Sequence, residues 1–114
     1  MLKNNISTQV VEALGACEKG KVYKRKDIIK IVVDFCNCNP ESVIPSDYCY
    51  NRLNDGIDYE KTIHLFEYEK RNHYIYRGLN YNYCGPVFHK PKKGKEYQIG
   101  EVTDGKFTLF ESDN

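Results

Sequence analysis

The chain has no tryptophan, and no stretch of it approaches the roughly eighteen consecutive apolar residues that a membrane-spanning helix needs. Its first fifteen residues lack the long apolar run and cleavage signal of a secretory leader. The five cysteines are an odd number, which suits a reducing compartment better than a disulfide framework. We therefore expect a cytoplasmic protein with free thiols and no membrane partner.

Residues for two further kinds of chemistry are also missing. The glycines from Gly78 onward are isolated, so no glycine-rich phosphate loop is present. A zinc site usually needs two closely spaced ligand pairs, and only Cys36-x-Cys38 is available. Cys84 is the candidate nucleophile, with His89 five residues away, but a cysteine before Gly-Pro is typical of a turn. We expect no catalytic residue, no cofactor and no bound metal.

The most informative absence is that of acidic residues between positions 70 and 95. This window holds seven Lys or Arg and two His but no Asp or Glu, although the whole chain has a formal net charge of only +1. Phosphate backbones attract cations and repel carboxylates, and each neutralised phosphate releases condensed counterions. The window therefore predicts a surface that contacts nucleic acid.

Length and hydrophobic patterning predict one domain, residues 1–114, of the α+β class. The 114 residues suffice for a single modest core, and ten Tyr and five Phe are typical of a globular chain. Apolar spacing of three and four residues predicts helices over 7–18 and 24–36. A proline start and an Asn-Asp-Gly stop predict a third helix over 45–54.

Beyond Gly56 the pattern changes to that of β-strands. Aromatic residues from Leu65 to Tyr76 predict two strands joined by a turn at 69–73. A loop is expected over 80–95, and Asp104-Gly105 joins two alternating runs as a second hairpin. We thus expect three helices followed by antiparallel β-hairpins.

The stretches KRKDIIKIVVDF, NCNPESVIP, SDYCYNRLNDG and HLFEYEKRNHYIYRG occur in an order that resembles the winged helix-turn-helix family. The resemblance covers a core of residues 7–78, and residues 79–114 add a basic loop and a C-terminal hairpin. It implies that the third helix lies in the DNA major groove and that the hairpin wing touches the backbone. Domains of this general look are also attached to bacterial restriction and other defence proteins.

The expected nucleic-acid contacts come from three segments. In the third helix Arg52 would read guanine and Asn51 adenine, although Asp47 and Asp55 make that helix less basic than most recognition helices. The hairpin and the basic loop supply cations and imidazoles. The full set of expected contact residues is Lys70, Arg71, His73, Arg77, Lys90, Lys92, Lys93, Lys95, Asn51 and Arg52.

Two other groups of residues extend this hypothesis. A second cluster of cations could continue the same face, and it consists of Lys19, Lys21, Lys24, Arg25, Lys26 and Lys30. The aromatic residues inside the acid-free window would either stack on exposed bases or pack against a half-buried sheet; they are Tyr74, Tyr76, Tyr81, Tyr83 and Phe88. Both alternatives are open from the sequence.

The sequence therefore favours a small non-enzymatic module that binds nucleic acid, with duplex DNA ahead of RNA. The alternative is a protein-interaction module of a regulatory or defence system. In that case the aromatic strands and the acidic C-terminal hairpin would join two copies of the chain or dock on a larger protein.

Overall fold

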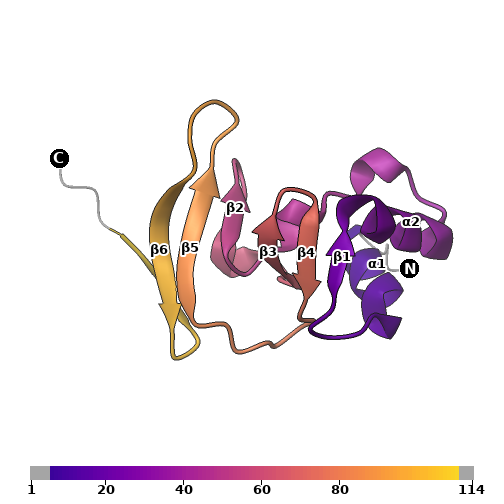
Figure 1. The fold of residues 1–114 in the computed structure, drawn as a ribbon, viewed down its shortest axis with the longest axis horizontal. Helices are drawn as coiled ribbons and strands as arrows, with labels where there is room; N and C mark the ends of the chain where they lie inside the picture. Colours follow the sequence, from indigo (N-terminus) through magenta and orange to yellow (C-terminus); the bar gives the residue numbers. More distant parts are fainter. Residues whose placement is uncertain (1–5, 111–114) are drawn as a thin grey trace.

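The computed structural model describes residues 6–110, which form two α-helices, four short 3-10 helices and seven β-strands (Figure 1). The α-helices are α1 (Ile6–Ala13) and α2 (Arg25–Cys36). The 3-10 helices are η1 (Leu14–Ala16), η2 (Pro40–Ser42), η3 (Pro45–Tyr48) and η4 (Tyr59–Lys61). The strands are β1 (Val22–Lys24), β2 (Arg52–Asn54), β3 (Phe66–Lys70), β4 (His73–Tyr76), β5 (Gly85–Lys90), β6 (Tyr97–Thr103) and β7 (Lys106–Leu109).

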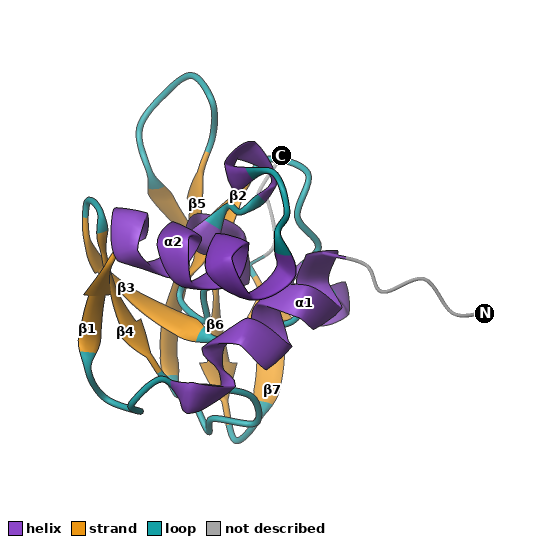
Figure 2. Cartoon of the chain, turned by 90° about the vertical axis from the view of Figure 1, so that its right-hand side faces the viewer, coloured by secondary structure: helices purple, strands orange, loops and turns teal. Residues whose placement is uncertain are grey.

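The strands make two separate sheets. The first sheet has the order β1-β4-β3, with both pairs antiparallel. The second has the order β2-β5-β6-β7, in which β2 runs parallel to β5 and the other pairs are antiparallel. The two α-helices lie beside the first sheet on the side away from the second sheet (Figures 1 and 2).

Each sheet has its own hydrophobic cluster. The first cluster packs α1 and α2 against the first sheet, with Val10, Leu14, Ile28, Val32 and Phe66 among its most buried members. Helix α2 supplies Ile28 and Val32 from one face, four residues apart, as an amphipathic helix requires. Asn37 ends the helix in a left-handed conformation, its N–H bonded to the Val33 carbonyl.

The second cluster lies on the second sheet. Its buried members are Tyr50, Leu53, Tyr83, Val87 and Val102, with several half-buried side chains packed around them. Gly100 lies on β6 opposite Leu109 of β7, where a side chain would overlap the carbonyl oxygen of Thr108. The absence of a Cβ at position 100 therefore permits the close β6–β7 pairing.

The predicted order of three helices followed by hairpins is wrong, and with it the winged-helix-like fold class. The chain is sheet-rich α+β: α1 and α2 overlap the first two expected helices, but the expected helix over 45–54 is absent. Only Pro45–Tyr48 forms a 3-10 turn, after which the backbone extends into β2. The physical reason is that this segment forms backbone hydrogen bonds with strands on both of its sides. The Tyr50 N–H donates to the Phe66 carbonyl of β3, and the Asn51 carbonyl accepts from the Phe88 N–H of β5.

Two further features differ from the expectations. The segment 80–95, expected as a loop, contains β5, which lies between β2 and β6 in the second sheet. Strand β1 was not expected and pairs with β4. Both expected hairpins are confirmed, as β3–β4 and as β6–β7. Asp104 and Gly105 both have positive φ, as the two-residue turn of such a hairpin requires.

Candidate nucleic-acid interface

The turn between β3 and β4 projects basic side chains and packs against the start of α2. Lys70 closes β3 opposite His73, and Lys70 and Arg71 are exposed. Asn72 adopts a positive φ, which lets the chain reverse, and its carbonyl oxygen accepts a hydrogen bond of 2.9 Å from the Arg25 N–H. His73 is oriented by a 2.9 Å contact between its Nδ1 and the Arg71 carbonyl. The turn is thus fixed next to the N-terminus of α2.

This contact joins two clusters of cations that are far apart in the sequence. A cavity of about 340 Å³ lies between the turn and α2, and its lining residues are Lys24, Arg25, Lys26, Asn72 and His73. All three basic residues are exposed. The first turn of α2 also carries the positive end of the helix dipole, so its field has the same sign as the side chains.

The loop between β5 and β6 contributes a third group of cations. Lys92, Lys93 and Lys95 are exposed there. The loop is braced at its base, because Asp55 accepts hydrogen bonds from the Lys92 N–H (2.9 Å) and from His89 Nε2 (2.7 Å). The Lys92 N–H bond and then the His89 bond hold the pKa of the Asp55 carboxyl below its usual value, against the opposing effect of desolvation.

The three segments lie toward the same end of the molecule. In Figures 1 and 2 the β5–β6 loop and the β3–β4 turn both point upward, and α2 begins beside the β3–β4 turn. We call this region the basic end and define it by nine residues: Lys24, Arg25, Lys26, Lys70, Arg71, His73, Lys92, Lys93 and Lys95. Three exposed acids, Asp27, Glu69 and Glu96, lie beside it in sequence.

The cations of the basic end form no ion pair with other described residues of the chain. Within residues 6–110 the ion pairs are Lys30–Asp34, Arg52–Glu96, Arg77–Glu67 and His89–Asp55. None of these includes a residue of the basic end. Their positive charge is therefore available to an external anion.

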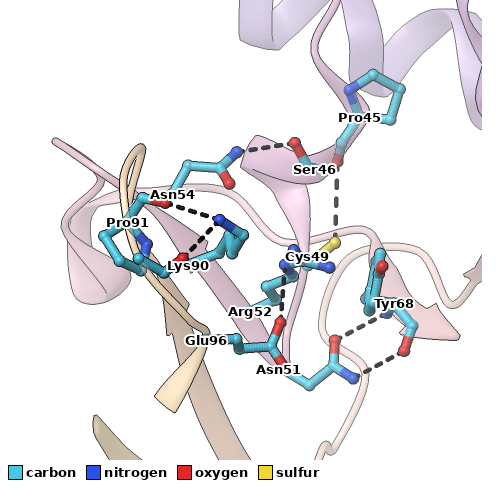
Figure 3. Close-up of polar contacts among 11 residues, drawn as sticks. Pro45, Ser46, Cys49, Asn51, Arg52, Asn54, Tyr68, Lys90, Pro91 and Glu96 are labelled. Atoms are coloured by element: carbon cyan, nitrogen blue, oxygen red, sulfur yellow. Dashed lines mark hydrogen bonds and ion pairs between the residues drawn. The ribbon is translucent and has the colours of Figure 1, made fainter. Parts of the chain in front are cut away.

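Lys90 and Arg77, two further residues expected at the interface, are used inside the protein. The Lys90 ammonium donates to the carbonyl oxygens of Pro91 (2.9 Å) and Gly94 (3.1 Å), where it closes the base of the β5–β6 loop (Figure 3). Arg77 follows β4 at the opposite end from the turn, pairs with Glu67 at 2.9 Å and lies 4.8 Å from the centre of the Tyr81 ring.

Asn51 and Arg52 do not lie on a recognition helix, so the prediction that they read bases from one is wrong. The Asn51 side-chain amide exchanges two hydrogen bonds with the backbone of Tyr68 (Figure 3). The Arg52 guanidinium stacks 3.9 Å from the centre of the Tyr68 ring, and its Nε lies 3.3 Å from Glu96 Oε1. That distance makes an ion pair, but the groups are not aligned for a hydrogen bond.

The second cation cluster is divided by the fold. Lys24, Arg25 and Lys26 belong to the basic end, whereas Lys30 pairs with Asp34 on the surface of α2 at 2.8 Å. Lys19 and Lys21 flank Gly20, whose N–H bonds to the Tyr76 carbonyl at the far end of β4. They are therefore removed from the β3–β4 turn.

Most aromatic residues of the acid-free window pack instead of stacking on an external base. Tyr74, Tyr76 and Tyr83 are buried, and burial raises the pKa of Tyr74 and of Tyr83 to about 12. Phe88 is half-buried. Tyr81 is the exception at 36% exposed, and it lies in the linker between β4 and β5.

The cysteines differ in part from the expectation of free thiols. Cys36 and Cys38 are paired as a disulfide around Asn37, whereas Cys17, Cys49 and Cys84 are free. Burial raises the pKa of the Cys49 thiol, so it stays protonated and packs as a small apolar side chain. Cys84 directly precedes β5, and His89 lies five positions further along the extended chain, which corresponds to about 16 Å.

No metal cluster is found in the described part of the chain, where no three His, Cys, Asp or Glu side chains are grouped as ligands. No helix among residues 6–110 has the length and apolarity needed to span a bilayer. The sequence shows the cations at the start of α2 but does not show that they lie against the β3–β4 turn. Strand β1, which pairs with β4, brings them there, and with only three residues it is too short to be predicted from the sequence pattern.

Comparison with known proteins gives a family. Residues 5–109 match the family described as "Domain of unknown function (DUF7225)", and the chain belongs to it. The chain is also 43% identical over 88 residues to the "Uncharacterized protein YnaC" of Bacillus subtilis (strain 168). That match covers 76% of the chain and 33% of the relative, so the chain spans about a third of the relative's length. No solved structure matches the chain.

Proposed function

We propose that this member of the DUF7225 family binds the phosphate backbone of nucleic acid through its basic end, with duplex DNA as the first candidate. The observation that carries the proposal is the convergence of exposed cations from α2, the β3–β4 turn and the β5–β6 loop, none of them in an ion pair within residues 6–110. Backbone contacts of this kind position a protein without reading sequence. The proposal involves no catalysis and places the protein in the cytoplasm.

The geometry supports backbone binding better than base reading. The basic end consists of a turn, a loop and a helix terminus, and the described residues there include no helix that projects its length into a groove. Lys and Arg side chains on such features neutralise phosphates, while the groups once expected to read bases are hydrogen-bonded or stacked internally. Affinity should therefore depend strongly on salt and weakly on sequence.

A salt titration with a short random-sequence DNA duplex tests the proposal. Fluorescence anisotropy at several salt concentrations between about 50 mM and about 200 mM should give a linear plot of log affinity against log salt. The variant Lys70→Ala/Arg71→Ala should weaken binding and make the slope shallower by roughly 0.9 for each phosphate that the protein no longer neutralises. Lys93→Ala/Lys95→Ala should act in the same direction.

Lys19→Ala/Lys21→Ala is the matched control, because it removes two exposed cations at the opposite end of β1 and β4. It lowers net charge by the same amount, so an equal loss of affinity would show general attraction instead of a site. Absence of binding at low salt would overturn the proposal. A single-stranded RNA of the same length, used as competitor, distinguishes DNA from RNA preference.

A second candidate function is self-association, and the edge of the second sheet favours it. β7 is the last strand in the order β2-β5-β6-β7, so its outer edge has no neighbour in that sheet. Leu109 at its end is 61% exposed and Phe110 is 47% exposed. Unpaired backbone groups beside exposed apolar side chains favour pairing with a second copy of the chain. Size-exclusion chromatography with light scattering would detect a dimer, and Leu109→Lys should dissociate it.

A further inference from the structure

A second cavity, of about 380 Å³, lies at the end of the molecule opposite the basic end. Figures 1 and 2 show that its walls, the β4–β5 linker and the β6–β7 turn, lie at the lower end of both views. Segments from three parts of the chain line it: Tyr50, Tyr59, Glu60, Thr62 and His64; Tyr81, Asn82 and Tyr83; and Val102, Gly105, Lys106 and Phe107. We call it the aromatic pocket.

The pocket walls are flat rings held in fixed orientations. Tyr59 stacks on His64 at 4.2 Å between ring centres and on Phe107 at 4.5 Å, with interplanar angles of 28° and 25°. Tyr50 contacts the ring of Tyr81 edge-on at 5.4 Å and the ring of Tyr83 at 6.2 Å. Six aromatic or imidazole rings therefore surround one cavity.

Hydrogen bonds lock these rings from behind. The Tyr50 hydroxyl donates to the Gly78 carbonyl (2.6 Å), the Tyr59 hydroxyl to the Tyr50 carbonyl (2.7 Å) and the Tyr83 hydroxyl to the Pro86 carbonyl (2.6 Å). Because these hydroxyls are bonded to backbone carbonyls, the three rings are held in fixed positions around the cavity. A ligand would meet walls that need no reordering, which lowers the entropic cost of binding.

The rim adds the polar groups that such a surface lacks. Glu60, Asn82 and Lys106 are exposed at the opening, and Thr62 is half-buried. An amide both donates and accepts, a carboxylate accepts from ring or exocyclic N–H groups, and an ammonium can meet a phosphate. The combination of flat apolar walls, a few polar groups and a volume of several hundred Å³ is typical of small-molecule sites.

We infer that the aromatic pocket binds a nucleobase carried on a free nucleoside or nucleotide. A flat ring complements aromatic walls by stacking, and the polar edges of a base complement the amide and carboxylate of the rim. The ammonium of Lys106 would meet the phosphate of a nucleotide. The site is distinct from the basic end, so the two can be tested independently.

The test uses NMR titration of the labelled chain with adenosine, cytidine, AMP and ribose 5-phosphate. Nucleoside binding should shift the signals of Tyr81, Asn82 and Lys106, with a Kd of about 1 mM or tighter. AMP should bind more tightly than adenosine, and Lys106→Ala should remove that difference. Comparison of adenosine with cytidine identifies the preferred ring size.

Tyr81→Ala is the informative variant because Tyr81 lies on the rim and its hydrogen bonds with the Tyr50 hydroxyl and the Tyr83 N–H come from its backbone, which alanine keeps. The substitution also removes the contacts of the ring with Arg77 and with the Tyr50 ring. It should weaken nucleoside binding about tenfold or more, the change expected when one aromatic ring no longer stacks on the base. Tyr97→Ala, which removes a 53% exposed tyrosine outside the pocket, is the control and should leave nucleoside affinity unchanged.

Three results would overturn the inference: no shifts with any nucleoside at millimolar concentration, equal affinity for ribose 5-phosphate and AMP, or a Tyr81→Ala variant that binds as well as the parent. Lys70→Ala/Arg71→Ala should bind nucleosides normally. A failure of duplex binding in that variant therefore bears on the basic end alone.

Discussion

The side chain of Asn51 exchanges two hydrogen bonds with the backbone of Tyr68: its Nδ2 donates to the Tyr68 carbonyl at 3.0 Å, and its Oδ1 accepts from the Tyr68 N–H at 2.8 Å. This pair continues the alignment of residues 48–50 along β3, where Leu65 N–H bonds to the Tyr48 carbonyl. On its other side, the Asn51 carbonyl accepts from Phe88 of β5. Asn51 therefore connects the two sheets.

Asn51→Ala should lower the free energy of unfolding by about 1–3 kcal/mol, because it leaves a partly buried N–H and carbonyl of Tyr68 without partners. Asn51→Asp should also destabilise, since it keeps the acceptor but sets a carboxylate against the carbonyl oxygen. Urea denaturation measures both. Asn82→Ala, at an exposed amide, should stay within about 0.5 kcal/mol of the parent. An Asn51→Ala variant as stable as the parent would contradict this role.

Arg52→Lys should destabilise the protein by about 1–2 kcal/mol although it conserves charge. The Arg52 side chain is 14% exposed, and its guanidinium lies over the Tyr68 ring, 3.9 Å from the ring centre, where a planar delocalised cation interacts better than an ammonium. Thermal unfolding measures the loss. Lys30→Arg, at an exposed residue paired with Asp34, is the matched exchange and should have almost no effect. DNA affinity should be equal in folded Arg52→Lys and parent, because Arg52 is internal.

Gly100→Ala should disrupt the second sheet. A Cβ at this position would overlap the Thr108 carbonyl oxygen and lie 2.9 Å from Phe107 Cε1 and 3.2 Å from Leu109 Cα. Two of these atoms belong to the backbone and cannot rotate away, so a loss of about 1–3 kcal/mol is expected. Hydrogen exchange should show faster opening of β6 and β7. Gly15→Ala, with no atom within 4 Å of the new Cβ, should leave stability unchanged or raise it.

His64 should make stability fall in mild acid. Burial lowers the pKa of its imidazole below the ordinary value of 6.5. As the pH falls below about 6.5, the unfolded chain binds a proton that the folded chain resists, so stability decreases until the lowered folded pKa is passed. His64→Phe should unfold with less difference between pH 7.5 and pH 5.5 than the parent does. Equal pH dependence in both proteins would argue against this cause.

The sequence pattern predicted correctly those elements whose conformation depends on residues within the element itself. Helix α2 could be predicted because Ile28 and Val32 recur on one face. The β6–β7 hairpin followed from Asp104-Gly105, whose positive φ angles the turn itself demands. The residues of the basic turn were likewise predictable, because an exposed hairpin tip is set by the strands on either side of it.

The sequence pattern gave a wrong prediction where hydrogen bonds to a segment distant in the sequence determine the conformation. The segment 45–54 begins with a helix-start signal and ends with a helix-stop signal, yet residues 49–54 extend because β3 and β5 offer backbone partners on the two sides. For the same reason Asn51 and Arg52 became internal connectors. The aromatic pocket was also missed, since Tyr59, Tyr81 and Phe107 are separated by more than twenty residues along the chain.

The sequence by itself determined the charge of the 70–95 window, the two α-helices and both hairpins, because each depends on neighbours within a few positions. Only the tertiary structure decided which cations share a surface, which of them form ion pairs or hydrogen bonds within the protein, and which rings enclose a cavity. Those outcomes depend on hydrogen bonds between remote segments, such as Arg25 to Asn72 and Phe88 to Asn51, and their register is not written in any local pattern.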